Sequence, residues 1–175
     1  MTSISVLFYP DGTLSLIRFR NIHGLHRIDG PATISFYENG LPNLQYFCIK
    51  RKLHRLDGPA TQQFYPDGSL HSKKYYINGK WHRIDGPADQ IFNNNGSIRE
   101  QSWWINSKRH RIDGSAIQLF SVNGSIEYQA YFINNKEISH THLLGLKLKF
   151  LILIKNFIHT SVSYTHLRAH ETRGN

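Results

Sequence analysis

A phrase of seven residues, His-Arg-Ile/Leu-Asp-Gly-Pro-Ala, recurs four times along this chain with a constant spacing of 28 residues. The copies begin at His26, His54, His82 and His110, and the last copy carries Ser115 in place of proline. A fixed period of this length indicates a repeat architecture, in which each unit packs against its sequence neighbours. We therefore predict a repeat array over residues 1–138, with about four and a half units.

Two further elements keep the same phase and define the local structure of each unit. Residues 60–65 have the mixed polarity of a short strand, and Pro66-Asp67-Gly68 is typical of a turn. Residues 69–77 are rich in aromatic and β-branched residues, which predicts a longer strand that ends at the hairpin signal Asn78-Gly79. The predicted fold is all-β: an extended antiparallel meander of hairpins in a single-layer twisted sheet, with a short C-terminal helix as a possible addition.

An aromatic pair marks the longer strand of the last three units. Adjacent residues of a strand point to opposite faces, so both faces of the sheet should carry aromatic side chains. They could form an exposed platform for a peptide, sugar or base, or they could stack across strands and hold the sheet together. Stacking across strands is the favoured interpretation for one face. For the other face, the sequence does not decide between stacking and binding. The candidate binding residues are Tyr75, Tyr76, Trp103, Trp104, Tyr131 and Phe132.

The repeated phrase also places histidine and aspartate in every unit. Such pairs can bind zinc or orient a catalytic base. A group present in four identical copies is better explained by a structural need of each copy: arginine can pair with the carboxylates along the ladder, and histidine can bond a neighbouring turn. We therefore predict a structural role, no metal site, no cofactor and no catalytic residue. The residues concerned are His26, Arg27, Asp29, Gly30, His54, Arg55, Asp57, Gly58, His82, Arg83, Asp85, Gly86, His110, Arg111, Asp113 and Gly114.

The chain resembles the MORN-repeat-variant class over about residues 4–138. The resemblance rests on the repeated phrase, on the Asp-Gly or Asn-Gly turns and on the Tyr-Ile-Asn-Gly-Lys hairpin at 76–80. Proteins of this class occur in large DNA viruses, phages and microbes. The resemblance implies a stacked β-hairpin sheet and a role in association with proteins or membrane surfaces. Standard MORN repeats are shorter and carry a Tyr-x-Gly pattern that this sequence lacks.

Composition and charge narrow the function classes. The chain is 39% hydrophobic, which excludes a disordered chain. Residues 1–138 hold 16 Lys and Arg and 11 Asp and Glu, and the basic residues form no long run. Nucleic-acid binding is therefore disfavoured. Cys48 occupies an aromatic position of the repeat and is expected to be a small packing residue.

The segment after the array has a different character. Residues 143–158 are apolar with three lysines, too short and too charged for a membrane span. We take the segment as 139–160 and consider three interpretations. It is a capping helix with Ser139 as N-cap, an interfacial membrane segment, or the product of a shifted reading frame. Residues 162–172 resemble a translated transposase-type sequencing adapter, so we expect 161–175 to be an artefact of a fragment cut before its true end.

The function predicted from these observations is a noncatalytic repeat scaffold that mediates protein–protein interaction in the cytoplasm. The alternatives are a peripheral module that binds a membrane surface or an anionic ligand, and the recognition part of a longer protein. The sequence predicts a protein partner and leaves the oligomeric state open.

Overall fold

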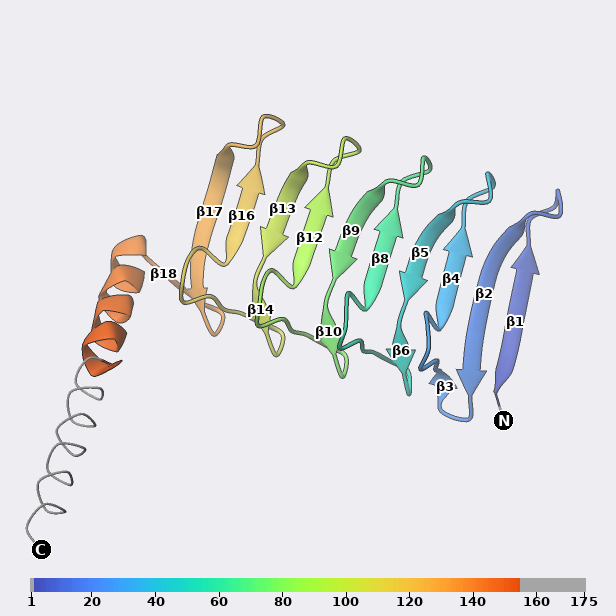
Figure 1. Ribbon diagram of the computed structural model, residues 1–175, viewed down its shortest axis with the longest axis horizontal. Coiled ribbons are helices and arrows are strands. Elements are labelled where there is room, and N and C mark those ends of the chain that lie inside the picture. The colour runs from blue at the N-terminus through green and yellow to red at the C-terminus, as the bar shows by residue number, and fades with distance from the viewer. Residues whose placement is uncertain (1, 155–175) are drawn as a thin grey trace, which may run out of the picture.

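The computed structural model describes residues 2–154 as a long, narrow antiparallel sheet followed by a helix (Figure 1). Neighbours in the sheet follow chain order, β1-β2-β4-β5-β8-β9-β12-β13-β16-β17-β18, with β3 paired to β2. This is the predicted all-β meander with its C-terminal helix. The predicted adapter-derived residues 161–175 lie outside the described residues.

Each unit contributes one long hairpin to the main sheet. The first strands of these hairpins are β1 (Ser3–Phe8), β4 (Thr33–Phe36), β8 (Thr61–Phe64), β12 (Asp89–Phe92) and β16 (Ile117–Phe120). The second strands are β2 (Leu14–Asn21), β5 (Pro42–Tyr46), β9 (Leu70–Lys74), β13 (Ile98–Ser102) and β17 (Ile126–Ile133).

The hairpin turns form where the sequence predicts them. In the third unit, the Tyr65 N–H bonds the Ser69 carbonyl at 2.8 Å, and the Asp67 side chain accepts a hydrogen bond from the Ser69 N–H at 2.9 Å. Gly68 has a φ of 86°, a conformation that glycine adopts without strain. A register shift between Gln63 and Phe64 completes the turn, and the other four long hairpins have the same shift.

A short second hairpin follows each long one. These hairpins pair β3 (Gly24–Leu25) with the end of β2, β6 (Cys48–Ile49) with β7 (Lys52–Leu53), β10 (Tyr76–Ile77) with β11 (Lys80–Trp81), β14 (Trp104–Ile105) with β15 (Lys108–Arg109), and the end of β17 with β18 (Lys136–Ile138). Asn78 and Gly79 both have positive φ, as a two-residue hairpin of the predicted kind requires.

The predicted continuous strand 69–77 is in fact divided at Tyr75. The Tyr75 N–H donates to the Ala88 carbonyl at 2.7 Å, whereas the Tyr75 carbonyl accepts from the His82 N–H at 3.1 Å. Tyr75 thus changes partners between its two backbone groups. The chain then leaves the main sheet for the short hairpin, which the composition of the segment could not reveal.

The alanines that end the repeated phrase form the tightest points of the fold. Ala32, Ala60, Ala88 and Ala116 are all completely buried. The Ala88 N–H bonds the Ser102 carbonyl at 2.9 Å while its own carbonyl accepts from Tyr75, so one small residue joins two neighbouring hairpins. A sheet of a single layer has little conventional core, and these close backbone approaches take its place.

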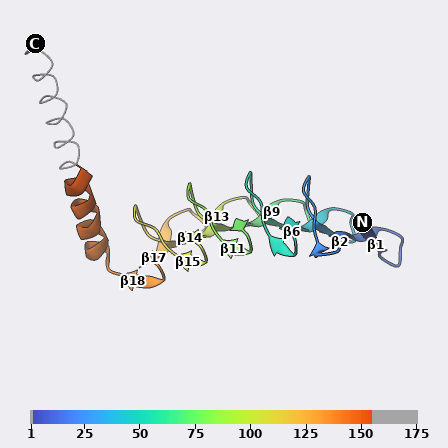
Figure 2. The ribbon, with the colours of Figure 1, turned by 90° about the horizontal axis from the view of Figure 1, so that it is seen from below.

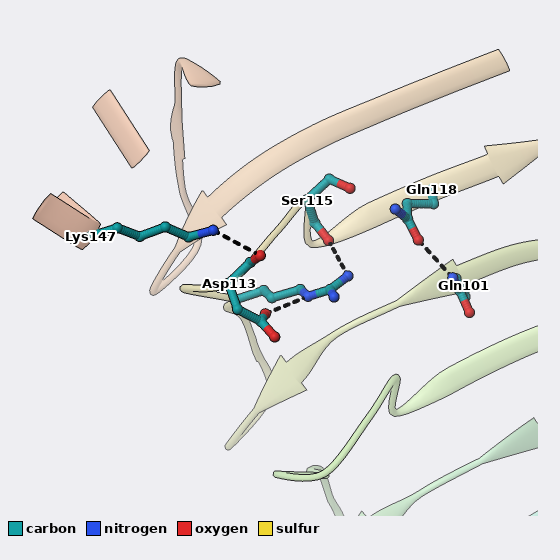
Figure 3. A network of polar contacts seen from close by, with 6 residues as sticks. Gln101, Asp113, Ser115, Gln118 and Lys147 are labelled. Carbon is teal, nitrogen blue, oxygen red and sulfur yellow. Dashed lines mark hydrogen bonds and ion pairs between the residues drawn. The ribbon is translucent and has the colours of Figure 1, made fainter. Parts of the chain in front are cut away.

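Ladders of side chains complete the contacts between units. A row of directly opposed residues crosses the middle of one face and consists of Gln45, Gln62, Lys73, Gln90, Gln101, Gln118 and Gln129. Within it, the Gln101 amide donates to the Gln118 side-chain oxygen at 2.6 Å (Figure 3). The Tyr65 hydroxyl likewise donates to the Phe92 carbonyl of the next unit at 2.8 Å.

Candidate interaction surface

The repeated phrase folds into a loop whose arginine lies flat on an aromatic ring. In the third unit, the Arg83 guanidinium carbon lies 4.0 Å from the centre of the Tyr75 ring. Its Nε donates to Asp85 at 2.9 Å and its Nη1 to the Pro87 carbonyl at 3.4 Å. Stacking and hydrogen bonding together fix the arginine. The same arrangement joins Arg27 to Phe19, Arg55 to Phe47, and Arg111 to Trp103.

The carboxylates of the loops pair within their own loop. We predicted pairing along the ladder, from one unit to another, but each arginine bonds the aspartate two residues later in the same copy. The hydrogen bond from Arg83 lowers the pKa of Asp85, and the corresponding bonds lower the pKa of Asp29, Asp57 and Asp113. Because the arginine and aspartate of one copy are only two residues apart in the sequence, the aspartate of the same loop is the nearest carboxylate.

The glycine of the phrase makes room for the arginine. A Cβ built on Gly86 would lie 3.1 Å from the Arg83 guanidinium carbon, and on Gly58 the corresponding distance to Arg55 is 3.0 Å. These separations are shorter than ordinary contacts between carbon atoms. The position of the arginine in each loop therefore requires a glycine three residues later, because a side chain there would be too close to the guanidinium group.

The histidines bond the next unit, as predicted. The His54 Nδ1 accepts a hydrogen bond from the Asn78 N–H at 3.1 Å, and the His82 Nδ1 accepts one from the Asn106 N–H at 3.3 Å. Within residues 2–154, no group of three or more His, Cys, Asp or Glu side chains gathers closely enough to hold a metal ion.

Successive loops enclose a row of three open grooves. The grooves have volumes of about 440, 440 and 590 Å³, and each lies between the loops of two neighbouring units. The aliphatic residue of each loop stands at its tip: Ile28, Leu56 and Ile84 are 84%, 78% and 84% exposed. We call Ile28, Leu56, Ile84 and Ile112 the aliphatic row. Single exposed aliphatic residues are ordinary, but here one recurs at the same position of every loop, with a groove between each pair of neighbouring loops.

The six predicted aromatic binding residues divide between the two faces. Tyr75 and Trp103 line the grooves, where arginines cover their rings. Tyr131 stacks against His140, with ring centres 5.1 Å apart. Tyr76, Trp104 and Phe132 come next in sequence and so point to the opposite face. All six are half-buried, and their binding role stays a prediction.

The opposite face carries a cluster of aromatic side chains and a buried carboxylate. Trp81 lies between Tyr76 and Trp104, with ring centres 5.2 and 5.1 Å away. Asp89 is 8% exposed, and its Oδ1 has no hydrogen-bond partner, because the Lys74 ammonium stands 4.0 Å away. Burial raises the pKa of Asp89 to about 6 and, with Asp89 contributing, that of Tyr76 to about 12.

Our sequence analysis missed Asp89, although a signal was present. The corresponding position holds Thr33, Thr61 and Ile117 in the other units, so an acid there breaks the pattern of the array. Cys48, on the same face, is buried as expected of a packing residue, and burial raises the pKa of its thiol.

The helix after the array sits on the last loop. Residues 140–154 are helical, and the Ser139 hydroxyl accepts from the His142 N–H at 3.1 Å, which confirms Ser139 as the N-cap. Leu143 is 1% exposed, and the Lys147 ammonium donates to the Asp113 carbonyl at 2.9 Å (Figure 3). Ile112 of that loop is 58% exposed, the least of the aliphatic row.

Beyond this contact the helix extends away from the plane of the sheet (Figure 2). Apolar side chains on its later turns stay exposed, Leu148 at 60% and Leu151 at 61% among them. In the part of the chain between residues 2 and 154, no helix combines the length and hydropathy needed to cross a membrane. In comparisons with known proteins, no family model matches this chain and no curated protein shows significant similarity to it.

Proposed function

We propose that this chain is a noncatalytic repeat scaffold that binds a helical segment of a partner protein along the aliphatic row and its grooves. The observation that carries the proposal is the seating of the chain's own helix on the last loop. The Lys147 ammonium of this helix donates to the Asp113 carbonyl of the loop, and Leu143 of the same helix is buried. The other loops repeat the arginine–aspartate pair of this loop, and no helix within residues 2–154 lies on them.

The chemistry of the expected partner follows from the loop. The aliphatic row offers apolar contact, and outward carboxylates stand beside it: Asp29, Asp57 and Asp85 have side chains that are 82%, 83% and 81% exposed. A complementary helix would present leucines beside lysines. Because the loops repeat, a longer helix or several helices could bind with similar contacts at each unit.

A peptide titration tests this proposal. A labelled synthetic peptide of residues 139–150, with its ends blocked, should bind the full chain saturably, as followed by fluorescence anisotropy. Replacing Ile28, Leu56 and Ile84 together by serine should weaken binding at least tenfold, since three apolar contacts are removed. Replacing the same three residues by valine is the matched control and should preserve binding. Equal affinity for the serine and valine variants would overturn the proposal.

A second candidate function is association with a membrane surface through the helix. The exposed apolar residues of its later turns, next to Lys147 and Lys149, favour this reading. Vesicles containing anionic lipid should sediment the chain, and Leu148→Glu together with Leu151→Glu should abolish this, whereas the serine changes in the aliphatic row should not. Unchanged sedimentation of the glutamate variant would refute the idea. A cytoplasmic location stays a prediction of the sequence.

A further inference from the structure

The main sheet ends in two strands that each lack a neighbour among the described residues. β1 pairs only with β2, and the Ile126–Ala130 part of β17 pairs only with β16. Strands that occupy these positions inside the array are more deeply buried. The side chains on the free strands are accordingly exposed: Ile4 60%, Leu7 53% and Phe8 63% on β1, and Ile126 and Tyr128 both 49% on β17.

These two edges carry few of the features that usually prevent strand pairing, and the bulge in β1 lies at its turn end, between Leu7 and Phe8. Natural edge strands are protected by lysines, prolines, bulges or covering segments. The sequence of β1 contains no charged residue and no proline, and Ile126–Ala130 contains only one charge, at Glu127. The helix begins beside β18 and extends away from the plane of the sheet (Figure 2).

The array itself contains the template for joining these two edges. Where one unit meets the next, β13 pairs with β16, and Glu100, Gln101 and Ser102 face Leu119, Gln118 and Ile117. β17 is the repeat equivalent of β13, and β1 is the equivalent of β16. Moving each residue by whole repeats, 28 residues forward for β13 and 112 back for β16, places Tyr128 opposite Leu7, Gln129 opposite Val6, and Ala130 opposite Ser5.

We propose that copies of this chain associate head to tail, with β17 of one copy pairing antiparallel with β1 of the next in this register. The partner is therefore a second copy of the chain. The pairing of β17 with β1 would continue the sheet from one copy into the next, as the pairing of β13 with β16 does between two units of one chain. The two surfaces differ, so each added copy leaves a free β17 and a free β1 at the ends. Such heterologous contacts produce open-ended assemblies. This proposal is independent of partner binding by the loops.

Disulfide trapping tests the register. In a Cys48→Ala background, Leu7→Cys with Tyr128→Cys should give a ladder of covalent oligomers on a non-reducing gel after mild oxidation, because opposed residues lie within disulfide distance. The matched control combines Leu7→Cys with Ile126→Cys. Ile126 is as exposed as Tyr128 but lies two residues out of register, so its ladder should be at least several-fold weaker. Ladders of equal strength, or none from either variant, would overturn the proposal.

A charge exchange tests the association without crosslinking. Sedimentation velocity of the unmodified chain should show an average mass that rises with concentration. Val6→Lys with Gln129→Lys places like charges opposite each other and should hold the chain monomeric. Val6→Lys with Gln129→Glu introduces the same number of charges but opposite signs at the joint, and should restore association. A chain that stays monomeric before any substitution would refute the proposal, as would equal behaviour of the two variants. Far-UV circular dichroism checks that each variant is folded.

Discussion

The two faces of the sheet differ in how closely their residues repeat from one unit to the next. On the loop face, each unit repeats the same arginine, aspartate and glycine, which fix the conformation of its loop, and the same histidine, which bonds the next unit. On the opposite face the corresponding positions vary: Cys48, Tyr76 and Trp104 are equivalent residues, as are Thr61, Asp89 and Ile117. The comparison indicates that contacts required by every unit are confined to one face, which leaves the other free to differ.

The largest effect should come from the alanine that joins two hairpins. Ala88→Leu would force a long side chain into a completely buried position between backbones, at a cost of about 3 kcal/mol or more. We expect a large fall in Tm or loss of the folded state, measured by circular dichroism. Ala88→Ser, which adds only one atom, is the control and should remain folded. Similar stability of the leucine and serine variants would show that the site is not closely packed.

Next in size should be the loss of a stacked arginine. Arg83→Ala removes the contact with Tyr75, the bonds to Asp85 and the Pro87 carbonyl, and should cost about 2 kcal/mol. Arg83→Lys retains the charge but not the flat, forked group, so it should recover less than half of this loss. Full recovery by lysine, in chemical or thermal denaturation, would mean that charge alone matters on the loop face.

On the variable face, one substitution should stabilise the chain. Asp89→Thr installs the residue of two other units and removes a buried carboxylate, for a gain of about 1–2 kcal/mol at pH 8. The folded pKa of Asp89 is raised from 3.8 to about 6, so the native chain should gain stability as the pH falls through 6 towards 3.8, and lose it as the pH rises through 6. This part of the pH dependence should be absent in Asp89→Thr. An unchanged profile would contradict the assignment.

The smallest effect should follow from removing one exposed loop carboxylate. The pKa of Asp85 is lowered by its bond with Arg83, so its contribution is present at neutral pH and is lost as the pH falls through the folded pKa, below 3.8. Asp85→Asn should therefore lower Tm slightly at pH 7 and differ still less from the unmodified chain at pH 3. A difference that grows towards pH 3 would reverse the expected sign.

The sequence by itself determined the array, its period, its turns and its two aromatic faces. Such features depend on local conformational preferences, as at Gly68 and Asn78-Gly79, or on the alternation of side chains along a strand, and both are readable from neighbouring residues. A structural role for the repeated phrase is a prediction of the same kind, because a need shared by all units appears in every copy.

Only the tertiary structure decided which hydrogen-bond and ion-pair partners the repeated residues contact. Arg83 could reach carboxylates of its own loop or of the next, and the loop conformation selects Asp85. Three further features depend on segments that meet only after folding: the division of strand 69–77 at Tyr75, the 4.0 Å separation of Lys74 and Asp89, and the hydrogen bond from Lys147 to the Asp113 carbonyl. Distances between such segments are set by the packing of hairpins, and no local pattern in the chain encodes them.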